Sequence, residues 1–261
     1  MVKSRKMIRK IISDFYMVLI LIFLYAPILT MMVLSFNQSK SRARWGGFTL
    51  DWYLFDSRSI MSALSTTLII AFVSALAAAV IGTAAAIAIQ SMRLVPRTII
   101  MGITNIPMLN ADIVTGISLM LSFIAFGVSL GFKTVLIAHI TFNIPYVILS
   151  VMPKLKQTDK STYEAALDLG ATPLQAFFKV VFPDILPGVL SGFLLSFTMS
   201  LDDFIITHFT KGAGINTLST LIYSEVRRGI KPSMYALSTV IFLTVLILLL
   251  IVNFRSFKKK D

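Results

Sequence analysis

Six long apolar runs constrain this chain more than any other feature of its sequence. They cover about residues 15–36, 63–89, 99–126, 132–151, 185–206 and 234–254. Each is long enough to cross the hydrocarbon core of a bilayer, which takes about 20 residues of helix. None shows the two-residue alternation of a barrel strand, and lipid offers no partner to an unpaired backbone group. The sequence therefore predicts an all-α polytopic membrane protein with six transmembrane helices.

The composition agrees with this class. Hydrophobic residues make up 56% of the 261 residues and charged residues only 14%, whereas soluble domains contain about 25% charged residues. The net charge is +12. Because the Lys and Arg residues lie mostly beside the apolar runs, we interpret them as orienting the chain in a bilayer, not as binding nucleic acid. The chain has no cysteine, which excludes disulfides, thiolate metal sites and cysteine nucleophiles.

The basic segments at the two ends set the expected orientation. Residues 1–14 precede the first run and residues 255–261 follow the last one. The first run is longer than the apolar part of a signal peptide and no cleavage pattern closes it, so we expect it to be retained. Residues 15–254 then form the transmembrane domain. The excess of Lys and Arg on the side of the two ends predicts that both termini lie in the cytoplasm.

Two of the runs are unusual for helices that face lipid. The third contains Pro107, which removes a hydrogen-bond donor, followed by Asn110 and Asp112. We expect a broken helix there, which is tolerated at membrane depth only against protein or a wet cavity. The second run is rich in small residues, which let helices approach closely in lipid, so we expect it to pack inside the bundle. Its small residues are Ser74, Ala75, Ala77, Ala78, Ala79, Gly82, Ala84, Ala85 and Ala86.

The segment 161–183, between the fourth and fifth runs, has the pattern of two short helices joined by a sharp turn. Ser161 and Glu164 have the spacing of a capping box. Gly170 is the residue best able to end the first helix, and Thr172 begins a second capping box. The segment is too short and too polar to cross the membrane. It either lies on the cytoplasmic membrane surface or docks a cytoplasmic partner.

The same segment carries the pattern Glu-Ala-Ala-x3-Gly-x9-Val-x-Phe-Pro, which resembles the EAA motif of ABC importer permeases. Val180 and Phe182 stand where that family has isoleucine and leucine. The resemblance implies that 161–183 is a coupling-helix segment that inserts into a cleft of an ATPase subunit. The coupling residues that it implies are Glu164, Ala165, Ala166, Asp168, Gly170 and Pro183.

Short motifs elsewhere are similar to those of the spermidine/putrescine permease subunits of the PotC type. Examples are Tyr25-Ala-Pro-Ile, Ser35-Phe-Asn37, His139-Ile-Thr-Phe142, Leu201-Asp-Asp-Phe204 and Leu221-Ile-Tyr-Ser224. The resemblance implies a type I ABC importer permease of the bacterial inner membrane that forms half of a polyamine path. It also implies three partners: a pair of ATP-binding subunits, a second homologous permease and an extracytoplasmic polyamine-binding protein. The alternative is the same machinery with another cargo, such as ferric iron or another small cation. No Lys or Arg lies deep in a run, which favours a cationic cargo.

The sequence lacks motifs for catalysis. It contains no G-x-x-x-x-G-K-[ST] phosphate loop and no H-E-x-x-H or G-x-S-x-G pattern. We therefore expect a transport subunit that is not an enzyme and has no catalytic residue, bound cofactor or metal. ATP and Mg²⁺ would be used by the partner ATPase. The isolated His139 is interpreted as a packed side chain and not as a metal ligand.

Carboxylates within the apolar runs are the candidates for contact with a polyamine, because such acids are rare in membranes and bind cations. Asp112 either contacts the substrate or caps the helix that restarts after the break. Asp202 and Asp203 end the fifth run and point about 100° apart on a helix, so we expect one to face the path and the other a neighbour. The alternative for this pair is an ordinary solvated helix end. Three aromatic candidates have core packing as the alternative: Phe142, Tyr146 and Phe197. Tyr223 and Glu225 lie in an outer loop beside Arg227 and Arg228, where the alternative is a salt bridge or a binding-protein contact.

Overall fold

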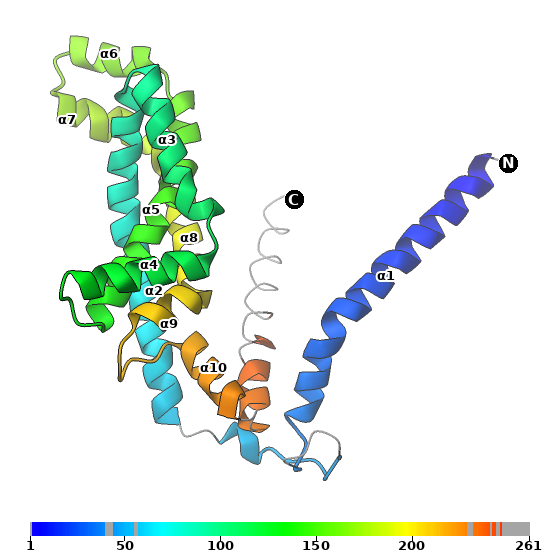
Figure 1. Cartoon of the computed structure of the whole chain (residues 1–261). Helices are drawn as coiled ribbons and strands as arrows, with labels where there is room; N and C mark the ends of the chain where they lie inside the picture. The colour runs from blue at the N-terminus through cyan, green and yellow to red at the C-terminus, as the bar shows by residue number, and fades with distance from the viewer. Residues whose placement is uncertain are drawn as a thin grey trace. The chain divides into compact units, whose positions relative to one another are not determined.

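The computed structural model describes residues 2–39, 44–54, 57–228, 232–240, 242–243 and 246 (Figure 1). In chain order it contains α1 (Val2–Leu34), the 3₁₀ turn η1 (Asp51–Tyr53), α2 (Ser57–Ser91), α3 (Leu94–Leu109), α4 (Asp112–Ala125), α5 (Phe132–Gln157), α6 (Lys160–Asp168), α7 (Pro173–Ala176), the π-helical turn η2 (Phe177–Val181), α8 (Phe182–Asp202), α9 (Ile205–Thr210) and α10 (Leu218–Arg228). The described ranges contain no strand, only an isolated bridge between Asn37 and Phe48. The predicted all-α class is confirmed.

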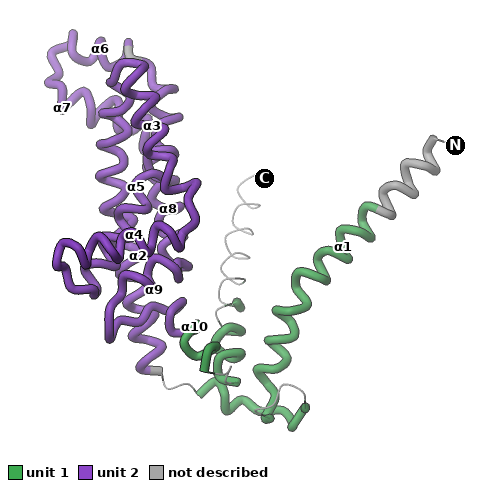
Figure 2. The backbone as a smooth tube through the Cα atoms, viewed as in Figure 1, with its two compact units in different colours: residues 1–57, 222–261 green, residues 58–221 purple. Residues whose placement is uncertain are grey.

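The chain divides into two compact units (Figure 2). Residues 1–57 and 222–261 form one unit, and residues 58–221 form the other. In the first unit, the apolar stretch Ser13–Leu34 of α1 has no buried residue. The loop after α1 is held by Trp52, whose Nε1 donates to the carbonyl of Asn37 at 2.8 Å. The second unit contains the packed core of helices.

Four stretches are long and apolar enough to cross a membrane: Ser13–Leu34, Arg58–Ser91, Phe132–Gln157 and Pro173–Asp202. A fifth is counted if α3 and α4 form one broken span, since they meet at an angle of 104°. Most of the sixth predicted run, 234–254, lies outside the described residues. The described residues 232–240, which include the start of this run, are helical.

The break in the third run is present, but it lies after Pro107 and not at it. α3 continues through Pro107, and the amide of Asn110 still donates to the carbonyl of Ile106 at 3.1 Å. Asn110 and Ala111 are extended, and α4 begins at Asp112. Asp112 lies in the first turn, where the positive end of the helix dipole favours a carboxylate. It makes no capping hydrogen bond, so the expectation that it caps the restarting helix is wrong.

The core of the second unit lies between α2, α5 and α8. Six of the predicted small residues of α2 are buried: Ser74, Ala75, Ala78, Ala79, Gly82 and Ala86. A Cβ at Gly82 would lie 2.7 Å from the Cβ of Val147 on α5, which is closer than two carbon atoms can approach. The expectation that this face packs inside the bundle is confirmed, and it allows α2 to lie directly against α5.

The first helix of the segment 161–183 begins earlier than predicted. Asp159 is the N-cap of α6, and its Oδ1 accepts from the amide of Ser161 at 2.9 Å. Ser161 therefore lies inside the helix, and the capping box predicted for it is wrong, because a carboxylate two residues earlier already holds the free amide. The helix ends as predicted. Gly170 has φ +87°, and the amides of Gly170 and Ala171 donate to the carbonyls of Leu167 and Ala166, which is a Schellman ending.

The second helix of the segment continues directly into the fifth span. The capping box at its start is confirmed: Thr172 and Gln175 exchange hydrogen bonds of 3.0 and 3.3 Å. After α7 the chain widens into η2 and then continues as α8. The wide turn directly precedes Pro183, which lacks an N–H, so the helix passes the proline without breaking. The helical rod thus starts at Pro173 and ends at Asp202, not at residues 185 and 206.

Candidate functional site

An acidic pocket of 330 Å³ is formed by residues of α4, α5, α8 and α9 in the second unit. Its lining consists of Asp112, Phe142, Met199, Asp202, Asp203, Phe204, Ile205 and Ile206. Four of the residues that the sequence singled out as substrate contacts, Asp112, Phe142, Asp202 and Asp203, therefore line one cavity. The break before α4 and the break after α8 are what bring these distant segments together.

The two neighbouring carboxylates of the pocket have different surroundings. Asp203 is only 9% exposed, and its Oδ1 accepts from the amide of Ile206 at 3.2 Å. Its Oδ2 accepts from the amide and the hydroxyl of Thr207, each at 2.8 Å, and lies 3.4 Å from Nε2 of His139. The carboxylate oxygens of Asp203 are therefore already hydrogen-bonded to neighbouring groups of the same chain.

Asp112 and Asp202 remain available for a ligand. Both side chains are exposed, and neither makes a hydrogen bond or an ion pair with another described residue. Asp202 is the last residue of α8, where the negative end of the helix dipole adds to its own charge. No Lys or Arg is among the residues that line the pocket. The lining thus leaves the negative charge of these two acids uncompensated, which favours the binding of a cation.

An aromatic wall stands beside these acids. Phe142 lines the pocket and is 8% exposed, and its ring is edge-on to those of His139 and Tyr146, at 5.4 and 6.4 Å between centroids. Tyr146 does not line the pocket. Phe204 and Met199 complete an apolar surface next to the carboxylates. A cation with methylene groups finds both kinds of contact here.

The other sequence-predicted candidates lie elsewhere. Phe197 is not among the pocket residues, and its ring stacks on that of Phe193 at 6.2 Å. Tyr223 and Glu225 belong to the other unit. There the carboxylate of Glu225 lies 3.7 Å from the guanidinium of Arg228, an ion pair that the sequence offered as an alternative.

Sequence reasoning missed the residues contributed by α9. Phe204, Ile205 and Ile206 line the pocket, and Thr207 binds Asp203 behind it. The fifth run was predicted to continue as helix through this stretch, which hid the turn. One local signal for the turn was present, because Asp is a preferred residue at the start of a helix and Asp203 directly precedes the missed stretch.

A second pocket, of 410 Å³, lies beneath α6. Its lining consists of Ile87, Gln90, Ser91, Leu155, Thr158, Asp159, Tyr163, Glu164, Phe177 and Val181. Glu164, the first residue of the EAA pattern, is thus at the crease between α6 and the membrane helices. Ala165, which does not line this pocket, is exposed on α6. At the turn after α6, the side chains of Leu169 and Leu174 are 89% and 71% exposed. Large apolar side chains on such a polar turn indicate a surface that another protein or the membrane covers.

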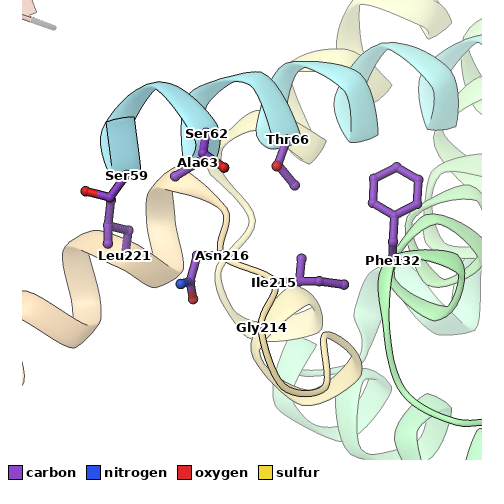
Figure 3. A pocket seen from close by; sticks show the side chains of 9 residues that line it. All are labelled: Ser59, Ser62, Ala63, Thr66, Phe132, Gly214, Ile215, Asn216 and Leu221. Carbon is purple, nitrogen blue, oxygen red and sulfur yellow. The ribbon is translucent and has the colours of Figure 1, made fainter. Parts of the chain in front are cut away.

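A third pocket, of 240 Å³, differs in its chemistry (Figure 3). Figure 3 shows Ser62 and Thr66 of α2 facing the loop that carries Ile215 and Asn216. Its polar groups are hydroxyls and an amide, and no charged side chain lines it. It therefore offers nothing to neutralise a polycation. Among the residues with described positions, no group of three or more His, Cys, Asp or Glu is arranged to hold a metal ion.

Comparison with known proteins points to membrane transport. The family described as "Binding-protein-dependent transport system inner membrane component" matches residues 80–259. The putrescine transport system permease protein PotI of Escherichia coli (strain K12) is 39% identical over 228 residues, which are 84% of this chain and 81% of that protein. The spermidine/putrescine transport system permease protein PotC of the same strain is 36% identical over 246 residues, 94% of this chain and 93% of that one.

Solved structures share the fold. A chain of a bacterial ABC transporter involved in the import of the acidic polysaccharide alginate superposes with a TM-score of 0.74 at 18% identity, covering 98% of this chain and 96% of that chain. A chain of the MetNI methionine ABC transporter superposes with a TM-score of 0.59 at 19% identity, covering 82% and 100%. At these identities the likeness concerns the fold, which is that of ABC importer permeases.

Proposed function

Because this chain belongs to the inner-membrane components of binding-protein-dependent transport systems, we propose that it is the permease subunit of an ABC importer that moves polyamines into the cell. The names of its relatives, which are permeases for putrescine and for spermidine and putrescine, suggest the cargo. The observation that carries the proposal is the acidic pocket, in which Asp112 and Asp202 have no partner among the described residues. This chain forms half of the path, and a second homologous permease completes it.

The chemistry of the pocket suits a polyamine in two ways. Each ammonium group of the cargo pairs with a carboxylate, so that Asp112 and Asp202 replace part of the hydration shell that the cation loses. The methylene spacers lie against Phe142 and Met199, and the face of Phe142 attracts the cationic ends. A compact metal cation would gain no binding energy from the apolar wall, and an anion would be repelled by the two carboxylates.

The cytoplasmic turn formed by α6 and α7 binds an ATPase subunit. Its coupling residues are Glu164, Ala165, Ala166, Asp168, Gly170 and Pro183, and the exposed Leu169 and Leu174 extend the apolar part of the contact. Both termini lie in the cytoplasm, so α8 starts on the cytoplasmic side and Asp202 ends it on the outer side. ATP and Mg²⁺ act at the partner ATPase pair, and an extracytoplasmic binding protein delivers the polyamine to the outer side.

Uptake by the complete complex in proteoliposomes tests the proposal. ATP-dependent, saturable uptake of labelled spermidine or putrescine is expected, with none of ferric iron. Asp112→Asn and Asp202→Asn should each raise the KM for polyamine about tenfold, which corresponds to about 1.4 kcal/mol of binding free energy. Asp184→Asn, at the opposite end of α8, is the matched control and should keep the wild-type KM.

Two results would contradict the proposal in different ways. Uptake of iron without uptake of polyamines would show that the cargo is wrong while the importer class holds. Polyamine uptake with an unchanged KM in both pocket variants would show that the cargo is right and the pocket is not its site.

A further inference from the structure

The turn between α8 and α9 is fixed by an unusual number of hydrogen bonds to one residue. The carboxylate of Asp203 accepts from the amides of Ile206 and Thr207 and from the hydroxyl of Thr207. Its backbone carbonyl accepts from the hydroxyl of Ser219 at 2.7 Å. Asp203 itself has left the helix, with φ −60° and ψ 123°. Hydrogen bonds to both the side chain and the main chain of Asp203 therefore fix the direction of the backbone just after Asp202.

His139 on α5 ties this turn to the wall of the pocket. Its Nε2 lies 2.9 Å from the hydroxyl oxygen of Thr207. That hydroxyl has one hydrogen, which it gives to Asp203, so it accepts from His139, whose Nε2 carries the hydrogen. His139 is 1% exposed, and its ring packs edge-on against Phe142, three residues further along α5. One buried side chain thus touches the aromatic wall and the acidic turn.

A second contact holds the other end of α9 against the same helix. The hydroxyl of Thr134, which is fully buried on α5, lies 2.8 Å from the carbonyl oxygen of Thr210. α9 is therefore attached to α5 through Thr207 and through its last residue, Thr210. Its first residues, Ile205 and Ile206, line the pocket. The position of this wall relative to Phe142 depends on these polar contacts and not on apolar packing alone.

We infer that His139 and Thr207 are positioning residues for polyamine binding: they hold Asp203 in the α8–α9 turn so that Asp202 alone of the two adjacent carboxylates is presented to the substrate. The inference rests on the proposed function, and it changes the role of Asp203 from a substrate contact to a support. A carboxylate that already accepts three hydrogen bonds has little left to offer an ammonium group. Asp202, one residue earlier, keeps its full charge for the cargo.

The pair Thr207→Val and Thr207→Ser separates the hydroxyl from the shape of the side chain. Both are measured in the complete complex in proteoliposomes, by the KM and maximal rate of labelled spermidine uptake. Valine keeps the volume but removes the donor to Asp203 and the acceptor for His139. We expect the KM of Thr207→Val to rise about fivefold to tenfold with a maximal rate within about twofold of wild type, since one charge-assisted hydrogen bond is lost. Thr207→Ser should restore the wild-type KM.

A wild-type KM in Thr207→Val would overturn the inference, and so would a KM in Thr207→Ser that rises equally. If Thr207→Val does not assemble, His139→Gln replaces it, with the same expected rise in KM, and an unchanged KM in that variant would overturn the inference in the same way. Asp202→Asn, measured in parallel, keeps the two proposals apart. An unchanged KM in Asp202→Asn counts against the pocket as the substrate site. If the KM rises in Asp202→Asn but stays unchanged in Thr207→Val, the result counts only against the positioning role.

Discussion

The hydroxyl of Ser74 on α2 lies 3.1 Å from the hydroxyl of Ser200 on α8. The side-chain amide of Asn143 on α5 donates to the same Ser200 oxygen at 2.8 Å. All three side chains are buried, so one serine joins the three core helices at a single point. Between helices in a membrane, where apolar surface gives no net attraction, such contacts contribute to association and fix which faces meet.

Removing this contact should loosen the bundle. Ser200→Ala leaves the side-chain amide of Asn143 buried without its partner, whereas the hydroxyl of Ser74 keeps its bond to the carbonyl of Ala71. We expect a loss of about 1 kcal/mol of stability. Thr198→Ala is the matched control, because Thr198 is exposed on the same helix and bonds only to carbonyls of its own turn. Thermal unfolding of the detergent-solubilised complex measures both. Equal midpoints for the two variants would contradict the role of Ser200.

The close approach of α2 and α5 gives a second prediction. A Cβ at Gly82 would lie 2.7 Å from the Cβ of Val147, whereas a Cβ at Gly102 on α3 would meet no atom within 4 Å. Gly82→Ala should therefore push the helices apart at a cost of about 1–3 kcal/mol, the usual effect of overpacking. Gly102→Ala should be neutral or slightly stabilising, because alanine favours a helix. The yield and melting temperature of the purified complex distinguish the two, and equal behaviour would refute the predicted clash.

The sequence allowed the helical class, the break in the third span and the turn at Gly170 to be predicted, because each depends on local chemistry. A glycine at φ +87° and a Pro, Asn and Asp close together in an apolar run act over a few residues. The start of the fifth span was harder to place. Pro183 indicates an interruption, yet the helix that starts at Pro173 passes through Pro183 after widening into η2, and only the surrounding packing decides between these outcomes.

The different surroundings of Asp202 and Asp203 were beyond the reach of the sequence. Helical geometry indicated that the two acids point apart, but not which one is hydrogen-bonded within the chain. The answer depends on His139, which lies more than sixty residues earlier in the chain and forms no motif with them. Contacts of this kind arise from tertiary packing, and a single sequence carries no signal for them.

The N-cap of α6 predicts a dependence on pH. The amide and side chain of Ser161 hold the pKa of the exposed Asp159 carboxyl below its ordinary value of 3.8. A carboxyl whose pKa is lower in the folded state stabilises that state above its unfolded pKa, and this contribution is lost as the pH falls through the folded value. The protection of the Ser161 amide from hydrogen exchange should thus decline on acidification below about pH 4. In Asp159→Asn, compared at each pH, that decline should be absent; a decline of equal size would exclude the carboxyl as its cause.

Glu164 gives the prediction that tests coupling most directly. Its side chain is exposed at the edge of the 410 Å³ pocket beside α6, near the exposed Leu169. A lysine at this position should therefore change the charge of the proposed contact surface without disturbing the core. Glu164→Lys should leave the chain inserted in the membrane but reduce co-purification of the ATPase and ATP-driven spermidine uptake by about tenfold or more, since a like-charge contact at an interface costs several kcal/mol.

The control for Glu164→Lys is Asp51→Lys, which makes the same change of charge at an exposed position in η1, expected on the outer side. It should retain both ATPase association and uptake. The two variants together separate a local effect at α6 from a general effect of added positive charge. Wild-type association and uptake in Glu164→Lys would mean that the turn of α6 and α7 does not carry motion from the ATPase, whatever the pocket at the other end of the bundle binds.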